Sequence, residues 1–80
     1  MYITNANGIR YGVLARVEAG RSNRLLLVHL GDDGSVVQYV IAYDWDEHYR
    51  QWSHGRYGSD RACMEQAFYE ICHDFLNNVF

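Results

Sequence analysis

The sequence predicts an α+β fold: an antiparallel β-meander of four to five strands with one C-terminal helix packed on one face of the sheet. Up to residue 58, runs of β-branched and aromatic residues are typical of strands. Turns that contain glycine and asparagine separate these runs, so successive strands can pair antiparallel. From residue 59 the apolar residues recur at three- and four-residue steps, which indicates a helix. We expect the 80 residues to form a single domain.

The first two strands are expected around a hairpin near the N-terminus. Asn7-Gly8 is typical of a two-residue hairpin turn, which would fold Tyr2–Thr4 back as a short edge strand. In 9–18 apolar and polar residues alternate, as in a half-buried strand. The side chains expected to share one face are Ile9, Tyr11, Val13, Ala15 and Val17. Residues 19–23 are expected to form a loop.

The next two strands, 24–30 and 35–44, are predicted on either side of the "GDDG" turn at 31–34. Neither strand has a cleanly polar side, since Leu25 and Leu27 oppose Leu26 and Val28. One helix covers only one face, so a monomer would expose a contiguous apolar patch, which is typical of an interface. A second copy of the chain is the simplest partner for it. Alternatively, loops and the N-terminal arm cover this face.

Residues 46–51 are expected to be the loop of a further hairpin, and 51–58 a shorter strand in which Gly55 marks a bulge or a close backbone contact. Ser59 and Asp60 are both good helix N-caps. The stripe expected on the sheet is Met64, Ala67, Phe68, Ile71, Phe75 and Val79. The residues expected to face water are Glu65, Gln66, Glu70, His73, Asp74 and Asn77.

Composition narrows the function classes. The formal charge of −3, with all seven basic residues arginine, disfavours broad non-specific binding to nucleic acid. The sequence lacks an apolar run of roughly 20 residues and the pattern of a signal peptide, so we expect a cytoplasmic protein without membrane contact. Cys63 and Cys72 fall on opposite sides of the predicted helix, about 13 Å apart along its axis. They are therefore expected to be free, structural thiols.

The segment 43–57, "YDWDEHYRQWSHGRY", concentrates the polar and aromatic chemistry of the chain. Its carboxylates and histidines lack the spacing of a calcium loop or a zinc site, so no metal or other cofactor is expected. The candidate nucleophiles Ser53, Ser59, Cys63 and Cys72 have no activating motif. Cys72 and His73 diverge by about 100° on a helix, and no phosphate-binding loop is present. We therefore expect a protein that is not an enzyme.

The leading prediction is a protein-interaction module, binding a partner protein or a second copy of itself as a dimer. Tryptophan, tyrosine and arginine dominate the strongest interface contacts. The predicted contact residues are Trp45, Tyr49, Arg50, Trp52 and Arg56, with Glu70 and Asp74 as a weaker patch on the helix. Another interpretation is that the two tryptophans staple the hairpin by cross-strand packing, and both roles are compatible.

Single-stranded nucleic acid is the alternative partner, because aromatic and arginine side chains together can stack bases. The side chains of Trp52, His54 and Arg56 are expected on one face of a strand, where they could stack against bases. Three carboxylates (Asp44, Asp46 and Glu47) outnumber the two arginines of the segment, which opposes this alternative.

The residues "YVIAYDWDE" followed by "WSHGRY" resemble a pattern in small single-domain bacterial proteins carried mainly on mobile elements of gut bacteria. The shared motif is W-x-x-G-x-Y, here Trp52, Gly55 and Tyr57, followed by a helix from Asp60. The resemblance covers about the last half of the chain and implies a hairpin followed by a helix, without an activity or a site. An origin in a phage or mobile element would add a sub-case, an inhibitor of a host defence system of the anti-CRISPR type.

Overall fold

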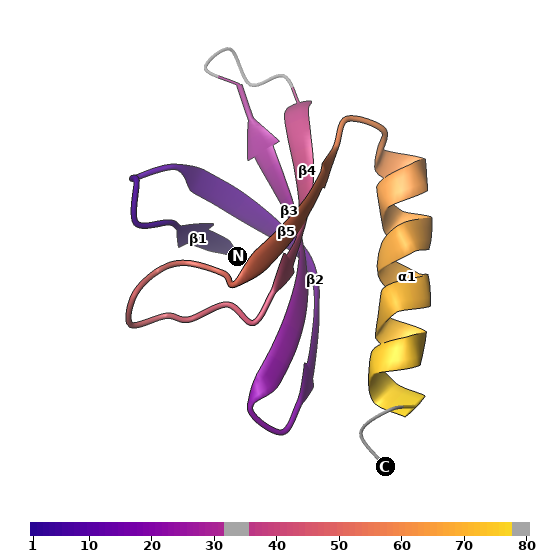
Figure 1. Cartoon of the computed structure of the whole chain (residues 1–80). Coiled ribbons are helices and arrows are strands. Elements are labelled where there is room, and N and C mark those ends of the chain that lie inside the picture. Colours follow the sequence, from indigo (N-terminus) through magenta and orange to yellow (C-terminus); the bar gives the residue numbers. More distant parts are fainter. Residues whose placement is uncertain (32–35, 78–80) are drawn as a thin grey trace.

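Five antiparallel strands follow one another across a single sheet, and one helix follows the last strand (Figure 1). This computed structural model describes residues 1–31 and 36–77, so most of the predicted "GDDG" turn lies outside the described residues. The elements are β1 (Tyr2–Thr4), β2 (Arg10–Ala19), β3 (Ser22–Leu30), β4 (Val36–Tyr43), β5 (His54–Gly58) and α1 (Arg61–Asn77). Each strand pairs with its sequence neighbour. The predicted α+β meander with a C-terminal helix is confirmed.

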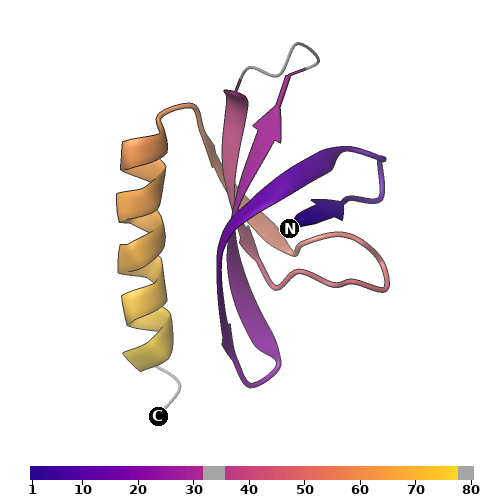
Figure 2. The ribbon, with the colours of Figure 1, turned by 180° about the vertical axis from the view of Figure 1, so that it is seen from behind.

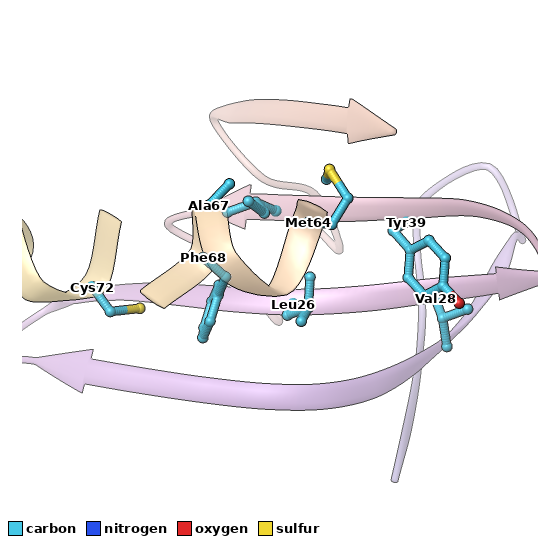
Figure 3. Close-up of a cluster of buried hydrophobic side chains, with 8 residues drawn as sticks. Leu26, Val28, Tyr39, Met64, Ala67, Phe68 and Cys72 are labelled. Atoms are coloured by element: carbon cyan, nitrogen blue, oxygen red, sulfur yellow. The ribbon is translucent and has the colours of Figure 1, made fainter. Parts of the chain in front are cut away.

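The sheet carries a hydrophobic core on each of its two faces. The helix-side core consists of Leu26, Val28, Tyr39, Ile41, Met64, Ala67, Phe68 and Cys72, from β3, β4 and α1 (Figure 3). The second core, on the opposite face, consists of Tyr11, Leu25, Leu27, Val40, Ala42 and Trp45. Ile3, Val13 and Trp52 pack against this second core. Leu25, Leu27 and Val40 are completely buried within the monomer, so the expected exposed apolar patch on this face is wrong. Residues of β1 and of the segment after β4 cover it instead.

β2 changes faces at a register shift between Val13 and Ala15. Before the shift, Tyr11 belongs to the second core and Val13 packs against it. After it, Ala15 and Val17 pack against the helix-side core. The prediction that all of these side chains share one face is therefore wrong, because the irregularity at Leu14 reverses the alternation. One strand thus contributes to both cores.

Two turns are tighter or longer than their sequence patterns predicted. The first hairpin closes with a three-residue loop, since the Asn5 amide donates to the Ile9 carbonyl oxygen at 2.9 Å. Gly8 takes the left-handed position of that loop with φ 83°. The predicted edge strand β1 is present. The predicted loop 19–23 shrinks to a two-residue turn, because Ala19 pairs directly with Ser22.

The helix α1 begins and packs as its sequence pattern predicted. The Asp60 side chain accepts a hydrogen bond from the Cys63 amide at 3.1 Å, which makes Asp60 the N-cap. Met64, Ala67 and Phe68 are buried against β3 and β4. The predicted position Val79 lies outside the described residues.

The two cysteines have different surroundings. Both are free thiols, Cys63 exposed and Cys72 buried in the helix-side core. Burial raises the pKa of Cys72 above its ordinary value, partly offset by the nearby Arg24. A buried thiol that stays protonated fits the structural role predicted for it. Within the described residues, no helix combines the length and the apolar character needed to cross a membrane.

Candidate binding groove

The segment between β4 and β5, here called the 44–53 loop, is anchored at its start by Asn23 of β3. The Asn23 side chain accepts from the Trp45 amide at 2.8 Å and donates to the Trp45 carbonyl oxygen at 3.1 Å. The Asp44 amide donates to the Asn23 carbonyl oxygen at 2.9 Å. Arg24 pairs with the Asp44 carboxylate at 3.0 Å. Together these contacts turn the chain back so that Trp45 enters the second core.

The tip of the 44–53 loop is closed by its own backbone. Asp46 and Gln51 form an isolated antiparallel bridge. The Asp46 carboxylate accepts from the amides of His48 at 2.8 Å and Tyr49 at 3.1 Å, so the turn is capped internally. Arg50 closes the turn in the left-handed region, with φ 55°. Tyr49 stands out from the tip with 64% of its surface exposed.

The 44–53 loop also touches the N-terminal hairpin. The Ala6 amide donates to the Arg50 carbonyl oxygen at 2.7 Å, which joins the two segments. Both lie on the side of the sheet opposite α1, as the two opposed views agree (Figures 1 and 2). Residues far apart in the sequence are therefore held side by side.

The motif Trp52, Gly55 and Tyr57 forms one compact contact. The Trp52 indole nitrogen donates to the Tyr57 hydroxyl at 3.2 Å. Both side chains lie over Gly55, where an added Cβ would come within 2.8 Å of the Tyr57 hydroxyl and 2.9 Å of the Trp52 nitrogen. The close contact predicted at Gly55 is present, although side chains and not backbone make the approach. The motif thus needs a residue without a side chain at its centre.

Aromatic side chains meet across the second face of the sheet. In a flat sheet, β2 and β5 would lie about 14 Å apart, three strand spacings. The rings of Tyr11 in β2 and Trp52 beside β5 nevertheless meet with centroids 5.4 Å apart and an interplanar angle of 78°. Trp52 also lies against Trp45, at 5.9 Å. Trp52 therefore reaches across the second core, from the segment before β5 to the side chain of Tyr11 in β2.

A groove of about 360 Å³ opens where the N-terminal hairpin meets the 44–53 loop. We call it the Trp52 groove. Its lining residues are Asn5, Ala6, Asn7, Ile9, Tyr11, Arg50, Gln51, Trp52 and Tyr57. Trp52 is half-buried, and Tyr57 has 53% of its surface exposed. Arg50 is exposed, and no carboxylate of the described residues lies within ion-pair distance of it.

Burial, and to a smaller extent the nearby Tyr57, raises the pKa of Tyr11 above its ordinary value. The phenol at the base of the groove is therefore neutral at physiological pH. Arg50 supplies the only formal charge among the lining residues. The groove offers aromatic surface, amide groups and one arginine, groups that can stack on a ligand and form hydrogen bonds with it. Among the described residues, no three histidine, cysteine or carboxylate side chains gather as metal ligands.

The predicted contact residues do not form one surface. Trp45 is only 7% exposed and belongs to the second core, so its prediction as a contact residue is wrong. Trp52 and Arg56 were expected on one face of a strand. β5 begins only at His54, and Trp52 lies before it against the second core. Arg56 pairs with Ile41 and therefore faces the helix side. The two tryptophan rings pack against each other, as the alternative interpretation of a hairpin staple predicted. Trp45 is buried and Trp52 is half-exposed.

The helix patch is separate from the Trp52 groove. Glu70 and Asp74 are exposed on α1, which covers the opposite side of the sheet. The Gln66 side chain donates to Glu70 at 3.3 Å, a contact within the helix surface. Of the predicted set, Arg50 and Trp52 line the groove, and Tyr49 lies at the neighbouring tip. A single partner surface would include these three residues without the helix patch.

Several important residues were missed by reasoning from the sequence. Asn5 and Asn7 line the groove from a segment interpreted only as a turn. Asn23 was placed in a loop, whereas its side chain organises the start of the 44–53 loop. Asparagine within a stretch that otherwise suits a strand was the available signal. Its partner Trp45 lies 22 positions away, so no local pattern could identify it.

Comparison with protein-family models, with curated proteins and with solved structures finds no match to this chain.

Proposed function

We propose that this chain is a non-catalytic binding module that contacts a partner protein through the Trp52 groove and the adjoining tip of the 44–53 loop. One observation carries the proposal: Trp52 and Tyr57, whose side chains are joined by a hydrogen bond, line the same groove as the exposed residue Arg50. These are the residue types that contribute most to protein interfaces, typically about 2 kcal/mol or more for a central residue.

The aromatic pair is held in place before binding. Trp52 contacts Tyr11, Trp45 and Tyr57, by two ring contacts and one hydrogen bond. A side chain that is already ordered loses little conformational entropy when a partner binds, which saves about 0.5–1.5 kcal/mol. Rigid anchors of this kind support a binding role better than mobile surface side chains would.

The backbone of Arg50 gives independent support. A residue other than glycine in the left-handed region costs of order 1 kcal/mol, and such strain is concentrated at functional sites. Glycine or asparagine would occupy this position more easily. Arg50 is exposed and lines the groove, and the ion pairs of the described residues do not include it. A contact with a partner accounts for an arginine at this strained position.

Charge favours a protein over single-stranded nucleic acid as the partner. A channel for a nucleic-acid backbone needs a continuous basic surface. The groove contributes only Arg50, and the adjoining tip carries Asp46 and Glu47. Arg56 lies on the other face of the sheet. Among the residues that the structure describes, the lining of the groove therefore gives the aromatic side chains no row of basic residues along which phosphates could bind.

The test is an affinity purification of the tagged chain from a lysate of the organism that encodes it, with and without nuclease treatment, compared by quantitative mass spectrometry with two variants. Arg50→Ala should release at least one protein that the original chain retains. Arg21→Ala, an exposed arginine in the turn between β2 and β3, should retain it. Retention that depends on intact nucleic acid, or that is equal for both variants, would contradict the proposal.

A separate measurement tests whether the partner is a second copy of the chain. Sedimentation equilibrium of the purified chain should give a monomer, because the second face of the sheet is covered within one chain. A dimer that Arg50→Ala dissociates would make the partner of the groove another copy, and would overturn the proposal of a different protein.

A further inference from the structure

The strand β5 forms one edge of the sheet, next to the Trp52 groove. It pairs with β4 on one side, and no strand of the described residues pairs with its other side (Figure 1). In an antiparallel edge strand, every second residue turns its amide and carbonyl groups away from the neighbouring strand. Among the described residues, backbone bonds outside the sheet ladders do not involve 54–58. The outer edge of β5 is thus available to a further strand.

The two faces of β5 differ in chemistry. His54 and Arg56 pair with Tyr43 and Ile41, so they project on the helix side of the sheet, where both are exposed. Gly55 and Tyr57 lie on the opposite face, and Tyr57 lines the Trp52 groove. A strand added beside β5 would place alternate side chains next to a basic surface and next to an aromatic groove.

We propose that β5 binds an extended segment of the partner protein as a sixth strand, with acidic and apolar residues alternating along that segment. This inference rests on the proposed function and specifies the mode of binding. Carboxylates on the helix side pair with Arg56, which has no carboxylate of the described residues within ion-pair distance. An apolar side chain on the opposite face enters the Trp52 groove beside Tyr57. The main-chain bonds provide affinity and the alternating side chains provide selectivity.

Charge also distinguishes this occupant from a second copy of the chain. A two-fold antiparallel pairing of β5 with itself, centred on Arg56, would place two arginines directly opposite each other. Like charges in that position destabilise a strand pair. The side chain that opposes self-pairing is therefore the one that attracts an acidic strand.

The probe is a capped seven-residue peptide in which glutamate alternates with valine and one central tyrosine, titrated into the ¹⁵N-labelled chain. The amide signals of His54–Gly58 should shift, and their hydrogen exchange should slow. Arg56→Glu should lower the affinity for this peptide about tenfold, the effect expected when an attractive cross-strand pair becomes repulsive. The same variant should gain affinity for a matched peptide with lysine in place of glutamate. Arg21→Glu, with the same change in net charge, should bind the glutamate peptide as the original chain does.

The outcomes separate the two proposals. No shift at millimolar peptide, or equal binding by the original chain and Arg56→Glu, overturns strand addition at β5. If a partner is lost with Arg50→Ala but not with Arg56→Glu, the groove binds as proposed and the edge does not. If β5 binds the peptide and Arg50→Ala still retains every partner, strand pairing stands and the function proposed for the groove fails.

Discussion

Truncation of Asn23 to alanine should destabilise the chain by about 2–4 kcal/mol. The side chain makes two hydrogen bonds to the backbone of Trp45, at 2.8 and 3.1 Å, and both are buried. Asn23→Ala leaves an amide and a carbonyl group without partners, and each such buried group costs about 1–3 kcal/mol. Asn23 is itself 9% exposed, so some hydration of the vacated site should keep the sum below the upper limit. For a domain of this size, the midpoint of thermal unfolding should fall by about 10–20 °C.

Asn5→Ala is the matched control. Its side chain also accepts two backbone hydrogen bonds, from Asn7 at 3.0 Å and Ile9 at 2.9 Å, but in an exposed position. Water can replace these bonds, so we expect a cost of about 1 kcal/mol or less. Urea denaturation should be followed by tryptophan emission, because both tryptophans lie in the 44–53 loop, and by far-ultraviolet circular dichroism. If the two variants agree within about 0.5 kcal/mol, Asn23 does not anchor the loop and the reasoning fails.

Four further predictions follow from the groove and the helix. Gly55→Ala should lower the free energy of unfolding by about 1–2 kcal/mol in urea titrations, because a Cβ would lie 2.8 Å from the Tyr57 hydroxyl; a more stable variant would show that the rings yield freely. Arg50→Gly should raise that free energy by about 1 kcal/mol, by relieving a φ of 55°, while weakening partner binding in the same purification assay; a loss of stability would contradict the assigned strain. A thiol reagent should modify exposed Cys63 rapidly and buried Cys72 only on unfolding, as read by mass spectrometry. Because burial raises the pKa of Cys72, the stability it contributes is complete below a pH of about 9 and is lost as the pH rises further, a trend that Cys72→Ala should weaken.

Patterns within a few residues predicted most of the elements. The alternation in β3 and β4 correctly separated Leu25 and Leu27 from Leu26 and Val28, because successive side chains of a regular strand point to opposite faces. The helix stripe and the N-cap at Asp60 were equally local, since an N-cap acts over three residues. The close contact at Gly55 followed from the unusual position of a glycine within a strand. Each of these features depends on neighbours that are adjacent or one helical turn away.

Tertiary structure decided which of the predicted contact residues are exposed and which of them line the groove. A single irregularity at Leu14 moved half of β2 to the other core, and alternation alone does not reveal where a strand breaks its register. Asn23 binds the backbone of Trp45, 22 positions away in the sequence. Trp45 is buried, so it does not belong to the surface on which it was expected. A backbone hydrogen bond from Ala6 to Arg50 joins the N-terminal hairpin to the 44–53 loop, and the groove forms between segments about 40 positions apart. The sequence by itself determined the order of the strands, the helix, and the apolar faces of the helix and of β3, because these depend on local periodicity. The Trp52 groove was decided by long-range packing, because it depends on contacts between segments far apart in the sequence and on two hydrophobic cores that share one sheet.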